Sequence, residues 1–295
     1  MKLARFLSIP ILSVLFLVGV LYYVTVFIFI DDWLSLQTSA GSLNALIFTF
    51  FASLCIFSYF VCVLKDPGTV PSSYVPDVEE NQLSDQESGR IGVQAVKCDK
   101  CLGHKPPRAH HCRVCKRCIL RMDHHCLWIN NCVGHKNYKS FVLLVFYATV
   151  ASTYSSIMLI SSILDKEWSS SRVNGWNPMT SLKLFYVTSG VMIFGLTLTL
   201  GTLLSWHIYL IAHNMTTIEY YAGSRASWLA RKSGVTYRHA FDVGTYKNIT
   251  LVSLSLSLSQ GRVHMHIFVS VCIIPFLKSW WCVMHLYGDG DAHNT

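Results

Sequence analysis

The stretch CDKCLGHKPPRAHHCRVCKRCILRMDHHCLWINNCVGHKNYKSF, residues 98–141, decides how this chain folds. It holds seven of the chain's eleven cysteines and six of its thirteen histidines. Cysteine and histidine crowded in this way, with CxxC pairs among them, are typical of zinc binding. Cysteines clustered at metal-ligand spacing argue against a disulfide framework and favour a reducing compartment.

The number of possible ligands predicts one free thiol. A structural zinc takes four ligands in a tetrahedron, drawn from thiolate and imidazole. Two sites of three Cys and one His each would use six of the seven cysteines in the stretch and leave one. The obvious candidate is Cys126, which ends the sequence Asp123-His124-His125-Cys126. A thiol, an imidazole and a carboxylate side by side are the groups of nucleophilic catalysis, so we predict two structural zincs that hold one reactive cysteine.

The composition on either side of this stretch is that of a membrane protein. Hydrophobic residues make up 52% of the chain and charged residues 14%, and the mean hydropathy is +0.39. Four uncharged segments are long enough to span a bilayer: residues 6–30, 43–64, 141–164 and 184–212. The first is too long for a signal-peptide core and lacks a small-residue cleavage site. We predict an all-α polytopic membrane protein, with four transmembrane helices and a small zinc-stabilised cytosolic domain between the second and third.

Positive charges predict the orientation in the membrane. Residues 65–140 contain twelve Lys and Arg, whereas residues 31–42 contain none and residues 165–183 contain three. Because basic loops stay in the cytosol, we expect the Cys/His-rich stretch and both termini there. The basic residues flank apolar segments and accompany no recognition helix, so nucleic acid is not an expected partner. Golgi, endoplasmic reticulum and plasma membrane are all compatible with this multi-pass reading.

The predicted organisation of the chain follows these features. It runs through helices 1 and 2 (1–64), a linker (65–97), the Cys/His-rich domain (98–140), helices 3 and 4 (141–212), a cytosolic region (213–252) and an atypical tail (253–295). The tail opens with SLSLSLS, which a CT dinucleotide repeat would encode, so translated non-coding sequence is one hypothesis for it. Residues 266–288 are apolar but interrupted, and a fifth span, an interfacial segment and an unselected tail remain open for them.

Residues 1 to about 250 resemble the DHHC family of protein S-acyltransferases, or palmitoyltransferases. The resemblance rests on the CxxC pairs, on Lys105 to Cys112, on Asp123 to Cys126, and on Asn130 to Phe141. Three flanking motifs agree with it. They are Asp66-Pro67-Gly68 after the second span, Thr216-Thr217-Ile218-Glu219 after the fourth, and Phe241 to Gly244 followed by Asn248.

The resemblance implies how the metal ligands divide and what the free cysteine does. One zinc would take Cys98, Cys101, His111 and Cys118, and the other would take Cys112, Cys115, His125 and Cys132. Cys126 would be the nucleophile, His124 the base and Asp123 the residue that orients it. By a ping-pong mechanism, Cys126 would take a fatty acyl group from acyl-CoA and pass it to cysteines of membrane-associated substrate proteins.

The resemblance also suggests contacts with the acyl-CoA. Trp128 is expected near the thioester end of the acyl chain, and Lys105 and Arg108 are candidates to meet the CoA phosphates. Ala151 is expected where the family reads chain length, and its small side chain predicts tolerance of chains longer than palmitate. Whether an accessory subunit is needed stays open. Many relatives have proline after the nucleophile, where this chain has Leu127.

A second reading comes from a different class of protein. The Cys/His-rich stretch can be a purely structural zinc module in a non-catalytic membrane protein, and an acyl group on Cys126 would separate the two readings. His104, His110 and His135 are expected to be solvated or hydrogen-bonded rather than ligands. His207, alone in an apolar span, is expected to be a satisfied packing or interfacial histidine.

Overall fold

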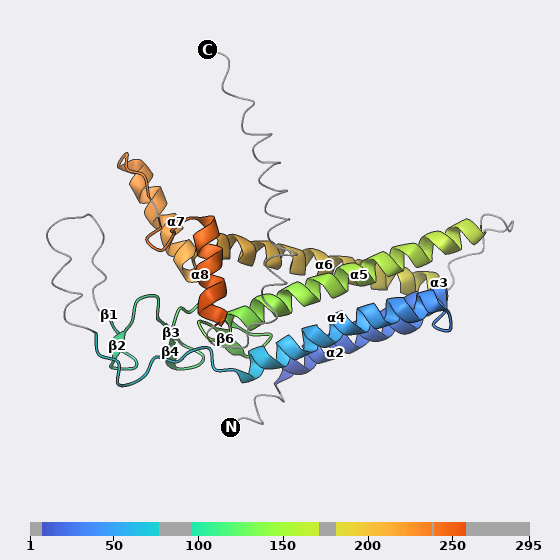
Figure 1. Ribbon diagram of the computed structural model, residues 1–295, viewed down its shortest axis with the longest axis horizontal. Helices are drawn as coiled ribbons and strands as arrows, with labels where there is room; N and C mark the ends of the chain where they lie inside the picture. Colours follow the sequence, from blue (N-terminus) through green and yellow to red (C-terminus); the bar gives the residue numbers. More distant parts are fainter. Residues whose placement is uncertain (1–7, 77–95, 171–180, 238, 258–295) are drawn as a thin grey trace, which may run out of the picture.

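The computed structural model describes residues 8–76, 96–170, 181–237 and 239–257. Long helices form a bundle, and a small unit of short strands lies at one end of it (Figure 1). The helices are α2 (Ile9–Val24), the π-helical turn η1 (Thr25–Ile30), α3 (Asp31–Leu34), α4 (Ser39–Leu64), α5 (Tyr138–Ser170), α6 (Ser181–Ala212), α7 (Thr217–Lys232) and α8 (Thr245–Ser257). Most of the linker and almost all of the predicted tail, including the 266–288 segment, lie outside the described residues.

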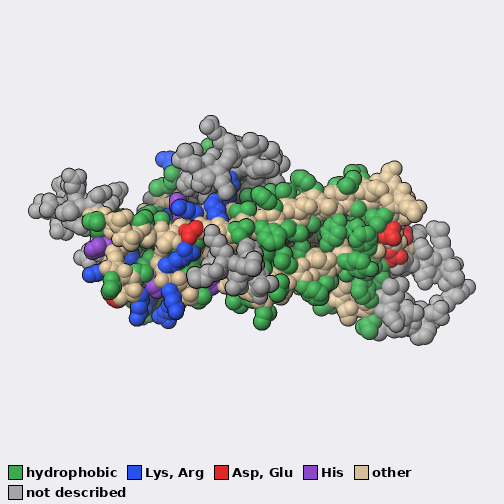
Figure 2. All heavy atoms as spheres, turned by 90° about the horizontal axis from the view of Figure 1, so that it is seen from below, with side chains coloured by type: hydrophobic (Ala, Val, Ile, Leu, Met, Phe, Trp, Pro, Cys, Tyr) green, Lys and Arg blue, Asp and Glu red, His purple; other side chains and the backbone are tan. Residues whose placement is uncertain are grey.

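Four of the described helical segments are long and apolar enough to cross a membrane, which confirms the predicted number. They are Ile9–Leu34, Ser39–Leu64, Tyr138–Asp165 and Leu184–Ala212. The first is one continuous rod, because α2, η1 and α3 follow each other without a break. Figure 2 shows hydrophobic side chains over the length of this bundle and Lys and Arg gathered at the strand-rich end.

Helix α5 is the centre of the bundle, since it packs against both α4 and α6. Hydroxyl groups inside the bundle pair with each other: the Thr25 and Ser155 side-chain oxygens are 2.6 Å apart, and those of Tyr22 and Thr49 are 3.0 Å apart. Polar groups have no water to bind in the bilayer core, so such pairs join neighbouring helices there.

The strand-rich unit consists of three antiparallel hairpins. Their strands are β1 (Val96–Lys97) with β2 (His104–Lys105), β3 (His110–Cys112) with β4 (Arg117–Ile119), and β5 (His124–Cys126) with β6 (Asn131–Val133). His111 lies opposite Cys118 in the second hairpin, and His125 lies opposite Cys132 in the third. Each of these two hairpins therefore brings one imidazole and one thiol to the same place.

The hairpins repeat with a period of fourteen residues. The residues of the first Cys/His group, 98, 101, 111 and 118, return fourteen positions later as 112, 115, 125 and 132. The backbone repeats as well, because Leu102, Lys116 and Asn130 all have positive φ, of 55°, 53° and 45°. Cys126 begins a third copy of the CxxC turn, but Ile129 stands where the second cysteine would be. The repeat thus ends in a turn that lacks a second thiol.

This third turn is fastened to the end of the bundle. The side-chain amide of Asn131 donates to the backbone carbonyls of Cys62 (3.0 Å) and Lys65 (2.9 Å), at the end of α4. The Tyr59 hydroxyl donates to the carbonyl of Trp128 at 3.0 Å. A Cβ on Gly134 would lie 2.8 Å from the Pro67 carbonyl oxygen, so the close approach requires glycine. These contacts place Cys126 where the spans meet the strand-rich unit.

Candidate functional site

The first Cys/His group has the shape of a tetrahedral metal site. Its members are Cys98, Cys101, His111 and Cys118, whose ligand atoms all lie within 4.8 Å of one another. The Nδ1 atom of His111 is 3.2, 3.6 and 3.9 Å from the sulfurs of Cys101, Cys98 and Cys118. A tetrahedron with ordinary zinc–sulfur and zinc–nitrogen lengths has N···S edges of about 3.6 Å. The group can therefore hold a metal ion.

The second group repeats this geometry with less spread. Its members are Cys112, Cys115, His125 and Cys132. The Nδ1 atom of His125 is 3.5 Å from the sulfurs of Cys115 and Cys132 and 3.6 Å from that of Cys112. Both groups contain the same residues as the two ligand sets that the family resemblance implies. His104, His110 and His135 belong to neither group.

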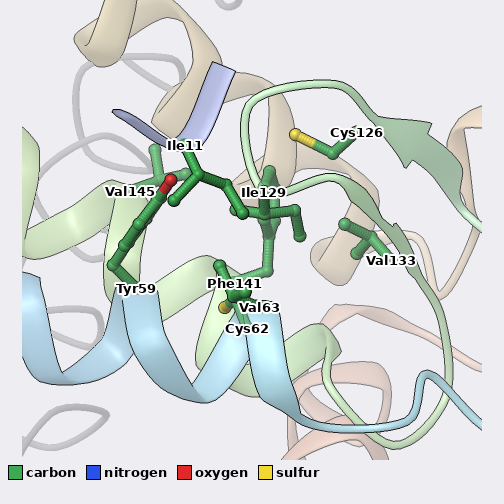
Figure 3. Packing of buried hydrophobic residues seen from close by; sticks show 9 residues of the cluster. All are labelled: Ile11, Tyr59, Cys62, Val63, Cys126, Ile129, Val133, Phe141 and Val145. Carbon is green, nitrogen blue, oxygen red and sulfur yellow. The ribbon is translucent and has the colours of Figure 1, made fainter. Parts of the chain in front are cut away.

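Cys126 stands outside both groups and faces the membrane helices. It is 8% exposed and lies in a cluster of buried residues drawn from α2, α4, α5 and the third hairpin (Figure 3). The other members of this cluster are Ile11, Tyr59, Cys62, Val63, Ile129, Val133, Phe141 and Val145. The candidate nucleophile is thus next to the apolar interior of the bundle.

Asp123 is the most buried member of the candidate triad. It is 0% exposed, and its Oδ2 atom is 2.7 Å from Nδ1 of His124. The backbone N–H of Thr217 donates to Oδ1, and the Thr217 hydroxyl donates to Oδ2, each at 2.9 Å. Burial alone would raise the pKa of Asp123, but the hydrogen bond to His124 and nearby charges hold it below its ordinary value. The carboxylate therefore stays ionised and can orient the imidazole.

His124 lies between the carboxylate of Asp123 and the thiol of Cys126. Burial alone would lower its pKa, but interactions with Asp123 and Cys126 outweigh burial and raise the pKa to about 9. Since Nδ1 is held by Asp123, the other ring nitrogen is left for proton exchange. This is the geometry of an imidazole that accepts a proton from a thiol and returns it to a leaving group.

The first turn of α7 packs against the site through Thr217. Thr216 caps this helix, because its hydroxyl accepts from the N–H of Glu219 while the Glu219 carboxylate accepts from the N–H of Thr216. The next residue, Thr217, is the one that binds Asp123. The capping box thus sets the position of a hydrogen-bond donor to the triad.

Arg108 lies in a different setting from the one expected. Its Nε and Nη2 atoms are each 2.6 Å from the Glu219 carboxylate, and its Nη1 atom is 3.3 Å from the Asn214 side-chain oxygen. The ring centroid of Phe241 is 4.4 Å from the guanidinium carbon. A guanidinium engaged at all three nitrogens ties the strand-rich unit to α7, which disfavours the expected contact with CoA.

The remaining motif residues act through backbone geometry. The Asp66 carboxylate accepts from the backbone N–H groups of Gly68 and Thr69, and Gly68 has a φ of 102° that suits glycine. Pro67 is buried beside Gly134. The Asn248 side-chain amide donates to the carbonyl of Ala212 at 2.8 Å and so fastens α8 to the end of α6.

The expected substrate contacts are spread along the bundle. Trp128, two residues after Cys126, has a side chain that is 61% exposed. Ala151 is 5% exposed in α5 and lies in a cluster with Val26 and Phe48. Lys105 is partly buried in β2.

Sequence reasoning missed Tyr59 and Asn131, which hold the turn that carries Cys126. The fourteen-residue repeat was a visible signal for the second of these. It shows that Asn131 replaces Arg117 of the preceding copy, directly opposite Cys126 in the hairpin register.

Comparison with known proteins agrees with this site. The family described as "DHHC palmitoyltransferase" matches residues 92–224. The chain is 60% identical to "Probable protein S-acyltransferase 15" of Arabidopsis thaliana over 79% of its own length and 88% of that protein. It is 49% identical to "Probable protein S-acyltransferase 16" of the same plant, over 83% and 84% of the two chains. It is 31% identical to "Palmitoyltransferase ZDHHC3" of Rattus norvegicus, over 76% and 75%.

Proposed function

Because the chain belongs to the DHHC family of protein S-acyltransferases, we propose that Cys126 carries the acyl group as a thioester between acyl-CoA and the substrate protein. The chain is a membrane-embedded palmitoyltransferase. One observation carries the proposal for Cys126. Its thiol lies outside both metal-binding groups, follows a hydrogen-bonded Asp–His pair whose carboxylate is buried, and lies among apolar side chains of the spanning helices.

In the first half-reaction, the thiol of Cys126 loses its proton to His124 and attacks the carbonyl carbon of the acyl-CoA thioester. A new carbon–sulfur bond forms to Cys126 and the bond to the CoA sulfur breaks. His124 returns the proton to the CoA thiolate as it leaves. Asp123, ionised and held by Thr217, keeps His124 in the tautomer that leaves its second nitrogen free.

In the second half-reaction, a cysteine thiol of the substrate protein takes the place of CoA. It gives its proton to His124 and attacks the acyl carbonyl. Cys126 leaves as the thiolate and regains the proton, so the enzyme is restored. No oxidant or other co-reactant is needed, since one thioester replaces another in each step.

The two Cys/His groups are proposed as structural zinc sites. Three thiolates and one imidazole in a closed tetrahedral set suit zinc, and they leave no open position for a substrate. When bound, zinc would lock the second and third hairpins and so fix the backbone that carries Asp123, His124 and Cys126. His125 and Cys126 are consecutive, so metal binding and catalysis share one strand.

The bilayer explains how the substrate is held. The acyl chain would lie among the spanning helices, where each buried methylene contributes about 0.8 kcal/mol. Trp128 lies beside the thioester end, and Ala151 lies deeper along α5, where we propose that chain length is read. Its small side chain favours tolerance of chains longer than palmitate, which an acyl-CoA competition assay would check. Lys105 is the remaining candidate for the CoA phosphates.

The orientation is proposed from charge. Lys and Arg gather at the strand-rich end of the bundle, as the positive-inside rule requires of a cytosolic face. The catalytic unit and both termini would then face the cytosol, where acyl-CoA and substrate cysteines are found. The membrane would be that of the Golgi, the endoplasmic reticulum or the cell surface.

Autoacylation tests the proposed intermediate. The purified full chain would be incubated with labelled palmitoyl-CoA beside Cys126→Ser, and the products treated with hydroxylamine. We expect a hydroxylamine-labile label that is absent from Cys126→Ser. Cys62→Ala is the matched control, because Cys62 is a buried cysteine of the same cluster. A label that survives in Cys126→Ser, or a wild-type chain with two zincs and no label, would contradict the proposal.

A further inference from the structure

Four rings meet where α5 and α6 reach the strand-rich unit. The ring of Phe141 is edge-on to that of His124, with centroids 5.3 Å apart, and to that of His207, with centroids 5.1 Å apart. The His207 ring lies 6.2 Å from that of His124 and 5.7 Å from that of Tyr138. His207 belongs to α6 and is 1% exposed. A histidine from the fourth span thus borders the candidate base.

His207 is held by a hydrogen bond as well as by packing. Its Nδ1 atom is 3.2 Å from the hydroxyl oxygen of Tyr138, the first residue of α5. This pair joins the end of α6 to the start of α5 at the level of His124. Burying a polar ring is costly without such a partner, and an apolar side chain could fill the same space. Filling the volume therefore does not explain why polar side chains stand at positions 138 and 207.

The orientation of His124 explains the presence of these polar side chains. Asp123 holds His124 at Nδ1 and Cys126 bonds the same ring, and because both partners act at the edge of the ring, its faces need other contacts to limit tilting. The neighbouring rings of Phe141 and His207 limit this tilt. A small misalignment of a catalytic group lowers the reaction rate steeply, so neighbouring rings that hold His124 in one orientation favour catalysis.

We propose that His207 is a positioning residue for His124, and that the Tyr138 hydroxyl fixes the His207 ring in this role. The inference rests on the proposed function, since it gives His124 the part of the base. It assigns a role to a side chain that, from sequence, is expected only to pack.

The experiment removes the hydrogen bond while it keeps the rings. In His207→Phe and Tyr138→Phe, each full-length chain retains an aromatic side chain but loses one partner of the bond. We expect the autoacylation rate constant at saturating palmitoyl-CoA to fall about fivefold in each, with half-saturation changed by less than about twofold. The double variant should be no slower than either single one, because both remove the same interaction.

Rescue and control variants complete the test. His207→Asn places an amide near the position of Nδ1, and we expect it to be faster than His207→Phe. His213→Phe makes the same exchange directly after the last residue of α6, where the His213 ring bonds the carbonyl of Tyr209, and should keep the wild-type rate. Zinc content and thermal unfolding would be measured for every variant.

Two outcomes overturn the inference. One is a wild-type rate in Tyr138→Phe or His207→Phe, which would leave His207 as packing alone. The other is a loss of rate that only follows loss of folded protein, with no rescue by asparagine. If His207→Phe does not fold, Tyr138→Phe decides the matter by itself. Failure of the wild-type chain to become labelled would instead contradict the proposed function.

Discussion

Two segments, fourteen residues apart, take equivalent places in successive hairpins: Ala109-His110-His111-Cys112 and Asp123-His124-His125-Cys126. In both, the second histidine belongs to a metal-binding group and sits opposite a cysteine of the neighbouring strand. In the first segment the final cysteine starts the next group, whereas in the second it belongs to none.

Two substitutions account for the difference. Ile129 replaces the second cysteine of the CxxC turn, so Cys126 has no partner thiol within three residues. Asp123 replaces Ala109, so the first histidine of the second segment gains a buried carboxylate. The third turn thus lacks the second thiol of a metal-binding turn, and its segment gains a buried carboxylate, which is the setting that we propose for the nucleophile.

The largest expected contrast comes from the same substitution at the two equivalent cysteines. Cys112→Ser removes a ligand from a proposed zinc site, and because a structural zinc contributes on the order of 10 kcal/mol to folding, we expect loss of zinc and of folded protein. Cys126→Ser should keep two zincs per chain and wild-type thermal stability while autoacylation disappears. Metal analysis and thermal unfolding of the two variants, side by side, measure this. Equal zinc loss in both would remove the distinction between the segments.

The next prediction concerns a substitution that gives the second segment the sequence of the first. Asp123→Ala creates the sequence of the preceding copy, and we expect autoacylation to fall about 10³-fold, because the base loses its orienting carboxylate. Zinc content should remain at two per chain. Asp123→Asn should be nearly as slow, since an amide can favour the wrong tautomer. Autoacylation within tenfold of wild type would mean that Asp123 is only structural.

The third contrast concerns the contact of each segment with α7. Arg108, directly before the first segment, pairs with Glu219, whereas Asp123 of the second segment bonds Thr217. Burial would raise the pKa of Glu219, but the bonds and charge of Arg108 hold it below the ordinary 4.5. A lowered native pKa stabilises the fold above pH 4.5, and this stabilisation is lost as the pH falls through the native value. We expect Glu219→Gln to cost about 3 kcal/mol at neutral pH, because it leaves the largely buried charge of Arg108 without its carboxylate.

The direction of the pH dependence of stability tests whether the charge of Glu219 is responsible. The difference in stability between wild type and Glu219→Gln should shrink as the pH drops below 4.5, while any zinc loss in acid affects both proteins alike. Asp66→Asn is the control, since the Arg117–Asp66 contact of 2.7 Å is about as short as the 2.6 Å of Arg108–Glu219 but is more exposed. A constant difference at all pH values would exclude the proposed charge effect.

The smallest expected effect lies just after the nucleophile. Leu127 stands where many relatives have proline, and its side chain is 61% exposed. Neither residue supplies a chemical group, so we expect Leu127→Pro to change autoacylation by no more than about twofold, as for other surface substitutions. A tenfold change in initial rate would show that the backbone after Cys126 tunes the reaction.

Composition was sufficient for the number of spans, and the family resemblance was sufficient for the two Cys/His groups. Members of one group, such as His125 and Cys132, lie close in the chain, so a local motif can carry their arrangement. The environment of Arg108 was not readable in this way. Its partner Glu219 is 111 residues away, and only the packing of α7 brings the two together.

By itself, the sequence predicted that two four-ligand groups would leave one thiol, and it determined that four segments are long and apolar enough to cross a membrane. These follow from local composition and short spacing. The tertiary structure alone decided that Thr217 binds Asp123, that Asn131 fastens the nucleophile's turn to α4, and that His207 borders His124. Such contacts depend on how helices distant in the chain pack against one another, which no local pattern encodes.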